Sequence, residues 1–412
     1  MLEDVKFKAR EEIRYSLSYC NFFLRRIGLS FIDDVPVTFN EKLIVFLSFV
    51  ISSSLLILMV VGQYAYIAYL LMNNVSLEQL IGSYLHIAGY DTMSFGKLLT
   101  IWYKQSSFRQ VVNELADIWP VSEEDQKAVA VKDNSLTSLR RRQALYLFWN
   151  VLGVWLYNLT PVVIHLYRLG RGMSSDLGYI WQIYYPFDKT KPFVHELVYI
   201  FETFAGVASV CCMLGSDVFF ISMANHISLL LRLLQERIRR LGMSDVDTNG
   251  VPITGTQDCY EQIVGVIKIH QRLISYANDL EDAFSVVNLI NVLLSSVNIC
   301  CVVFSIVFLE SWMEMSNKFF LGAAMTQMGI VCWYADDIYR ASMGVSDAVY
   351  ESGWYRCNTR SRRGLLAMLQ RSQKPLYFTA LKFKTITMTT YTSILTTSYS
   401  YFTLLYTSYR QE

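Results

Sequence analysis

Long apolar stretches separated by charged segments dominate the pattern of this 412-residue chain. A helix needs about 20 consecutive apolar residues to cross a bilayer core of roughly 30 Å. The clearest candidate carries no charge between Lys42 and Glu78. In all, the pattern predicts seven transmembrane helices, at residues 43–71, 78–102, 143–167, 196–222, 285–310, 319–339 and 383–407.

Acidic residues interrupt some of these predicted spans, and Asp91 lies deepest, some 13 residues into the second. Glu202 and Asp217 fall in the fourth span, and Asp336 and Asp337 near the end of the sixth. Intramembrane carboxylates are expensive and often functional. Either Asp91 borders a water-filled cavity or an ion route, or the helix ends early and Asp91 lies near the inner surface.

Positive charges indicate the orientation, because Lys and Arg are retained on the cytoplasmic side. With the amino terminus inside, the cytoplasmic segments hold 26 Lys and Arg residues and the external segments hold 6. The prediction is a cytoplasmic amino terminus and an extracellular carboxyl terminus, the reverse of a G-protein-coupled receptor. All eight cysteines fall in cytoplasmic or membrane segments, so no external disulfide pair is available.

The longest internal segment has its own helical periodicity. Within residues 225–241, apolar side chains recur at helical spacing against a basic face: Leu229, Leu230, Leu233, Leu234, Ile238 and Leu241. Residues 242–258 are turn-rich, and a second periodic stretch follows them. We predict a cytoplasmic helical hairpin; the alternative is an amphipathic pair lying on the membrane surface.

These observations predict an all-α, polytopic membrane protein with cytoplasmic helical extensions. Its expected parts are a cytoplasmic amino-terminal segment (1–42), helices one to four (43–222), the hairpin (223–284), helices five and six (285–339), a second cytoplasmic segment (340–382), and helix seven with a short external tail (383–412).

Composition narrows the function by exclusion. Hydrophobic residues make up 53% of the chain, and 36 basic side chains face 35 acidic ones, so nothing indicates nucleic-acid binding. Zinc-ligand spacing, a phosphate-binding glycine loop and a hydrolase triad are missing, and we predict no enzyme, metal or cofactor. His86 suits packing better than ligand contact. Asn74 begins a glycosylation sequon in a predicted external loop.

The last predicted helix is unusually rich in hydroxyl groups. Between Thr385 and Tyr409, 25 residues carry no charge, and 18 of them bear a hydroxyl. One helical stripe holds Ser393, Thr397, Ser400, Leu404 and Ser408. A hydroxyl-lined path narrowed by an apolar ring is a known pore design, and one helix per subunit would surround a symmetry axis. The alternative is helix packing through small hydroxyl residues.

Three carboxyl-terminal motifs resemble the signature of the insect odorant receptor family. They are DAVYESGWY (347–355), RSQKPLYFTA (371–380) and SYSYFTLL (398–405). The resemblance implies a ligand-gated, non-selective cation channel in the plasma membrane of olfactory neurons, a heterotetramer in which an odorant-tuned subunit joins a co-receptor. It also implies that the last helix lines the pore. The segment at 223–284 is shorter than in the co-receptor, so the chain resembles a tuning subunit.

The resemblance further implies a pocket for a small volatile odorant among the outer halves of helices two, three, four and six. By position, it would draw on Tyr84, Ile87, Tyr90, Trp149, Gly153, Tyr157, Phe204, Ala208 and Met325. The alternatives are a gustatory-type channel of the same superfamily, whose terminal signature is missing here, and a transporter, whose repeated halves are not seen.

Overall fold

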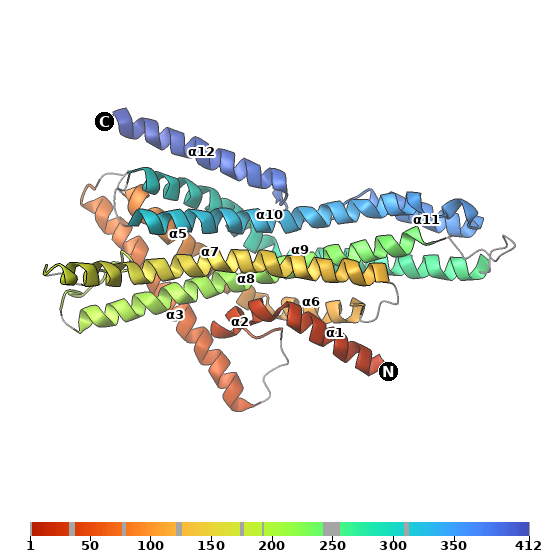
Figure 1. The fold of residues 1–412 in the computed structure, drawn as a ribbon, viewed down its shortest axis with the longest axis horizontal. Helices are drawn as coiled ribbons and strands as arrows, with labels where there is room; N and C mark the ends of the chain where they lie inside the picture. The colour runs from red at the N-terminus through yellow and green to blue at the C-terminus, as the bar shows by residue number, and fades with distance from the viewer. Residues whose placement is uncertain are drawn as a thin grey trace.

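Four long helices form the body of the protein. The computed structural model describes residues 2–32, 38–75, 80–120, 126–173, 177–191, 193–241, 256–308 and 313–411. The long helices are α7 (Gln126–Gly170), α8 (Val194–Arg239), α9 (Thr256–Phe308) and α10 (Met313–Glu351), and they run along the long axis of the molecule (Figure 1). At ~1.5 Å per residue each is about twice as long as a bilayer core. Each therefore extends well beyond the membrane.

Shorter helices surround this body. Helix α3 (Phe39–Met72) crosses it obliquely (Figure 1). Its first turn is capped by Thr38, whose hydroxyl accepts a hydrogen bond from the Glu41 amide at 3.3 Å. The other elements that precede α7 in the chain are α1 (Leu2–Ser16), α2 (Ser18–Arg26), the π-helical turn η1 (Ile81–Leu85), α5 (His86–Tyr103) and α6 (Gln105–Ile118).

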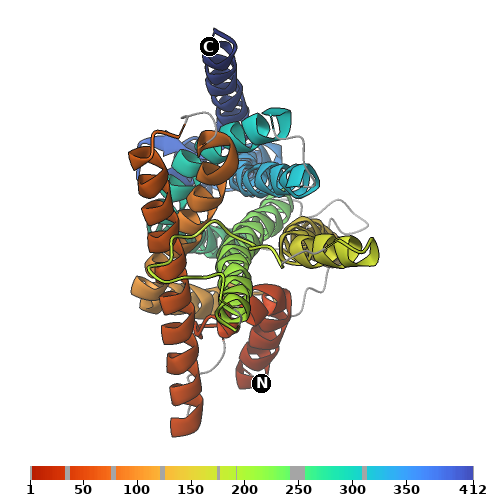
Figure 2. The same ribbon diagram turned by 90° about the vertical axis from the view of Figure 1, so that its left-hand side faces the viewer.

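The carboxyl-terminal part ends in a helix that projects from the body. After α10 come η2 (Trp354–Arg356), α11 (Thr359–Ser372), the two-stranded hairpin of β1 (Thr379–Ala380) and β2 (Lys384–Thr385), and α12 (Met388–Gln411). The strands are antiparallel, with Thr379 opposite Thr385. Residues 384–385 therefore belong to the hairpin, and the last helix begins at Met388. Figure 2 shows α12 rising from the body, where it contacts α9 and α10.

The expectation of an all-α membrane protein is confirmed. Among the described helices, hydropathy alone identifies four that are long and apolar enough to span a membrane: α3, α7, α8 and the part of α9 from Tyr260. Helices α5 and α12 coincide with the second and seventh predicted spans but hold ionised or hydroxyl side chains. In α5 these side chains, Asp91 and Lys97, face protein, so mean hydropathy understates how well this helix suits the membrane.

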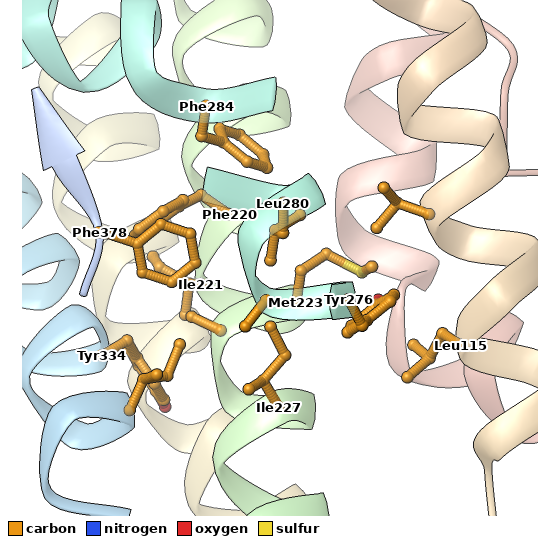
Figure 3. Packing of buried hydrophobic residues seen from close by; sticks show 14 of the residues in the cluster. Leu115, Phe220, Ile221, Met223, Ile227, Tyr276, Leu280, Phe284, Tyr334 and Phe378 are labelled. Atoms are coloured by element: carbon orange, nitrogen blue, oxygen red, sulfur yellow. The ribbon is translucent and has the colours of Figure 1, made fainter. Parts of the chain in front are cut away.

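The core is densest around the middle of α8. The rings of Phe220 in α8, Phe284 in α9 and Phe378, the residue before β1, pack together (Figure 3), and the Phe220 centroid lies 5.0 and 4.9 Å from those of Phe284 and Phe378. The apolar residues of 229–241 continue this core and are at most 6% exposed within a single chain. They pack inside the protein, so the alternative of a pair lying on the membrane surface does not hold for α8. The predicted turn-rich tip lies mostly outside the described residues, since 242–255 are not among them.

The two termini lie toward opposite ends of the long axis (Figure 1). This arrangement accommodates the predicted inverted orientation, which stays a prediction. Asn74 is exposed in the turn after α3, with φ of 53°, but Ser76 of its sequon lies outside the described residues. Its glycosylation likewise stays a prediction.

Candidate functional site

A small cavity lies among α5, α7, α8 and α10. Its volume is about 40 Å³, room for a few water molecules at about 10–15 Å³ each. The lining is mostly aromatic and aliphatic, with three polar side chains, and consists of Ile87, Tyr90, Asp91, Asn150, Gly153, Val154, Tyr157, Trp181, Gly206, Ser209, Val210, Phe320 and Ala323. Ligand sites in proteins commonly span about 300–1,000 Å³. A larger ligand would therefore need these side chains to move apart.

Four of the predicted ligand-binding residues line this cavity together: Ile87, Tyr90, Gly153 and Tyr157. The other five lie elsewhere. Tyr84 packs edge-on against Tyr66, with ring centroids 5.4 Å apart, and Trp149 lies against Phe319 at 5.5 Å.

Three further predicted residues, from α8 and α10, also lie outside the lining. Phe204 is 61% exposed on the outer surface of α8, and Ala208 is buried without reaching the cavity. The carbonyl of Met325 accepts a hydrogen bond from the Tyr391 hydroxyl of α12 at 3.3 Å.

The segment between α7 and α8 closes one side of the cavity, and the sequence did not predict this. Trp181 from this segment stacks on Tyr157 with centroids 5.2 Å apart. It lies so close to Gly206 that a Cβ there would be 3.1 Å from the indole ring. Any larger residue at 206 would displace Trp181.

Glu202 holds Trp181 in place. This fully buried carboxylate accepts hydrogen bonds from the amides of Ile180 and Trp181, at 2.7 and 3.0 Å, and from the Tyr185 hydroxyl at 3.0 Å. Burial raises the pKa of the Tyr185 phenol, and the Glu202 carboxylate beside it adds to the effect, so Tyr185 remains a donor. Glu202 thus positions a cavity wall without lining it.

Asp91 lies in the cavity wall. This position decides between the two interpretations offered by the sequence, a cavity beside Asp91 or an early end of the helix. It is 2% exposed, and α5 continues beyond it to Tyr103. One carboxylate oxygen accepts a hydrogen bond from the Gln63 side-chain amide of α3 at 2.7 Å, and the other lies 2.6 Å from the Ser209 hydroxyl of α8. Asp91 therefore borders a cavity inside the helix bundle rather than an early helix end.

A second buried carboxylate forms an ion pair beyond the cavity. Lys97 donates to one oxygen of Asp217 at 2.6 Å, and the two side chains are 0% and 1% exposed. Tyr146 and Gln327 donate to the other oxygen at 2.8 and 2.9 Å. One carboxylate thus connects α5, α7, α8 and α10, the same four helices that surround the cavity.

Helix α12 has two contrasting faces. Ile394, Ser398 and Leu405 turn toward the body, and the Ser398 hydroxyl donates to the Ser296 carbonyl of α9 at 3.0 Å. The predicted pore residues lie on the other side: Ser393, Ser400, Leu404 and Ser408 are exposed, and Thr397 is half-buried. Leu404 is 66% exposed, whereas its neighbour Leu405 packs against Phe304 and Cys301.

Helix α10 connects the cavity to α12. Phe320 and Ala323 of α10 line the cavity, while Met325 binds Tyr391 of α12. Further along, the Asp336 carboxylate lies 3.5 Å from the Met388 amide, at the first turn of α12. Helix α10 therefore contacts both the cavity and the base of α12.

Comparison with known proteins identifies the family. Residues 76–399 match the family described as 7tm odorant receptor, a match that covers most of the chain. The chain belongs to the 7tm odorant receptor family. This receptor is 27% identical to Odorant receptor 85b of Drosophila melanogaster over 96% of its own length and 99% of the relative's. It is 25% identical to Odorant receptor 85c of the same species, over 78% and 81%.

The fold also matches solved insect receptors. The structure of the olfactory receptor OR5 from Machilis hrabei in complex with eugenol superposes with a TM-score of 0.82 at 14% identity, covering 97% of this receptor and 99% of that chain. A second structure of OR5 superposes at 0.77 and 15% identity, covering 96% and 98%. The chain is therefore a multi-pass membrane receptor with the insect olfactory receptor fold.

Proposed function

We propose that this receptor is an odorant-tuned subunit of a ligand-gated, non-selective cation channel. Its partner would be a co-receptor subunit in a heterotetramer, and its location the plasma membrane of olfactory sensory neurons. The family assignment supports an odorant receptor role, and the segment at 223–284, which is shorter than in the co-receptor, favours a tuning subunit.

The proposed ligand is a small volatile molecule bound in the cavity. The wall of Tyr90, Tyr157, Trp181 and Phe320 offers dispersion contacts and apolar burial to such a molecule. The Machilis OR5 structure in complex with eugenol supports this class, since eugenol is a small aromatic compound.

One observation carries the channel proposal, namely the exposed hydroxyl face of α12. Within the described residues most of this face is exposed, although a helix with so many hydroxyl groups gains little from facing lipid tails. Placed around a symmetry axis, the faces of four subunits would form a wet path, with Leu404 as its dry constriction.

Gating follows as a population shift. A ligand that binds the open arrangement a hundredfold better than the closed one supplies about 2.7 kcal/mol toward opening. The cavity must widen to take such a ligand, and α10 borders both the cavity and α12. Widening of the cavity would thus bias the position of α12.

Co-expression with a co-receptor tests the proposal. We expect odorant-evoked cation current in cells that express both chains, measured against a panel of small alcohols, amines, esters, ketones and aromatics. Cells that express either chain alone provide the controls. Absence of current with every odorant, despite surface delivery shown by an external tag, would contradict the proposal.

Two adjacent leucines test the pore face. Leu404→Ser should hydrate the constriction and raise ligand-independent current, because a polar ring no longer excludes water. Leu405→Ser is the matched control, since Leu405 lies about 100° round the helix and packs against α9. Equal leak from both variants would mean that the α12 hydroxyl groups serve packing.

A further inference from the structure

The cavity contains a buried carboxylate with no cationic partner. Asp91 receives hydrogen bonds from Gln63 and Ser209, both neutral, and within the described residues no Lys or Arg forms an ion pair with it. Lys97, the cation nearest to it along α5, is committed to Asp217. Asp91 is thus a potential anion facing a mostly apolar cavity.

Asp91 also has hydrogen-bonding capacity to spare. A carboxylate offers about four lone-pair sites, and the described contacts use two of them. A buried charge without a counter-ion is costly, and a cation or a strong donor beside it offsets that cost. Asp91 is itself part of the cavity lining, so a ligand that moves these side chains apart would come within reach of the carboxylate.

Two of the polar side chains in the lining touch each other. Asp91 and Ser209 are in contact on α5 and α8, and Asn150 adds an amide from α7. Aromatic rings make up much of the rest, including Trp181 and Phe320. A ligand with an apolar body and one polar end matches this division.

We propose that Asp91 makes the cavity selective for ligands whose polar end donates a hydrogen bond, a hydroxyl or a protonated amine, over ligands of the same shape without a donor. The inference rests on the proposed function, in that it takes this cavity as the odorant site. The donor would bind Asp91, while the apolar body lies against Trp181 and Phe320.

A matched benzyl series tests the selectivity. Benzyl alcohol, benzylamine, ethylbenzene and benzyl methyl ether share one skeleton and differ in the terminal group. Hydrogen bonds to a charged partner contribute enough for a preference of about 10- to 100-fold. We expect the alcohol or the amine to exceed ethylbenzene and the ether by this factor, in evoked current and in thermal stabilisation of the purified receptor complex.

Two substitutions at Asp91 separate hydroxyl from amine recognition. Asp91→Asn keeps an acceptor but removes the charge, so a preference for benzylamine should vanish while one for benzyl alcohol persists. Asp91→Leu should abolish both and favour ethylbenzene. Thr92→Val is the control, because Thr92 follows Asp91 but does not line the cavity; its hydroxyl bonds the Ala88 carbonyl and lies 3.1 Å from the Tyr64 hydroxyl.

The two readouts distinguish failure of this inference from failure of the channel proposal. Donor-selective stabilisation without any current would leave the selectivity standing and contradict the channel. Equal effects of all four compounds, no stabilisation by any of them, or a donor preference that survives Asp91→Leu would overturn the inference.

Discussion

Two buried aspartates on neighbouring helices have opposite surroundings. Asp217 has a cation and two neutral donors, from Lys97, Tyr146 and Gln327, and does not line the cavity. Asp91 is equally buried, but it has two neutral donors and borders the cavity. Burial alone would rank the two carboxylates together.

The two aspartates differ in which groups neutralise and hydrogen-bond each carboxylate. At Asp217 the protein supplies a counter-ion and two further donors, so this residue links four helices and leaves little for a ligand to add. At Asp91 the partners from the protein are incomplete, and a ligand can supply the next one. Counter-ions and unused lone pairs therefore separate a structural carboxylate from a candidate binding group more clearly than exposure does.

The largest effect should come from breaking the ion pair between Lys97 and Asp217. Lys97→Met leaves Asp217 buried without its cation, and loss of one partner of a buried pair costs about 3–5 kcal/mol. We expect loss of most of the folded receptor at the cell surface, measured by surface labelling and by gel filtration of the solubilised protein.

A double variant and a control sharpen that prediction. Lys97→Met with Asp217→Asn removes both charges and should recover much of the folded protein, because no unpaired ion remains. Lys104→Met, at the end of the same helix, removes a lysine that bonds only a carbonyl and should fold normally. Equal damage from the single and double variants would show that the charge pairing is not what stabilises this region.

A smaller effect is expected at the wall of the cavity. Glu202→Gln keeps the side-chain shape but weakens the acceptor shared by the amides of Ile180 and Trp181. Trp181 should then be held less firmly, and ligand sensitivity should fall about 10- to 100-fold. Trypsin cleavage after Lys189 should also become faster, because Lys189 belongs to the same segment as Trp181. Its ammonium group lies 4.1 Å from the ring centroid of Tyr179, a contact that a loosened segment would lose.

Glu196→Gln provides the matched control. It is the same change on an exposed residue of the first turn of α8, six residues before Glu202. Unaltered sensitivity and cleavage are expected. A Glu202→Gln receptor with the sensitivity and cleavage rate of Glu196→Gln would show that Trp181 is held by packing alone.

The sequence predicted the helices well because membrane helices are long and apolar. Spacings of three and four also grouped the predicted pore residues on one stripe of α12, because they place residues on one face whatever the neighbours are. That this stripe lines a pore stays a prediction. The four predicted residues that line the cavity came from the resemblance to the odorant receptor family and from no local pattern, and their role in ligand binding stays a prediction. The helices and the α12 stripe depend on local patterns.

The unpredicted features depend on distant partners. Lys97 and Asp217 are 120 positions apart, and no local pattern pairs them. Trp181 reaches the cavity because its segment folds back onto Glu202, which hydropathy treats as a defect in a span. The leucine periodicity of 229–241 indicated a buried face but not its partner, which proved to be the same chain.

The smallest effect should come from filling the cavity itself. A Cβ at Gly153 would meet no atom within 4 Å, so Gly153→Ala adds a methyl group to the cavity without displacing a neighbour. Ligands that fill the cavity should lose about tenfold in sensitivity, smaller ones should lose none, and the helix should be at least as stable, because alanine favours helix over glycine. Gly265→Ala in α9, also free of close neighbours, is the control for helix stabilisation and should leave all ligands unaffected. Dose–response curves for a series of alcohols of increasing length measure the difference. If sensitivity to the longest and the shortest alcohol fell equally, Gly153 would act through the position of α7 and not through the space in the cavity.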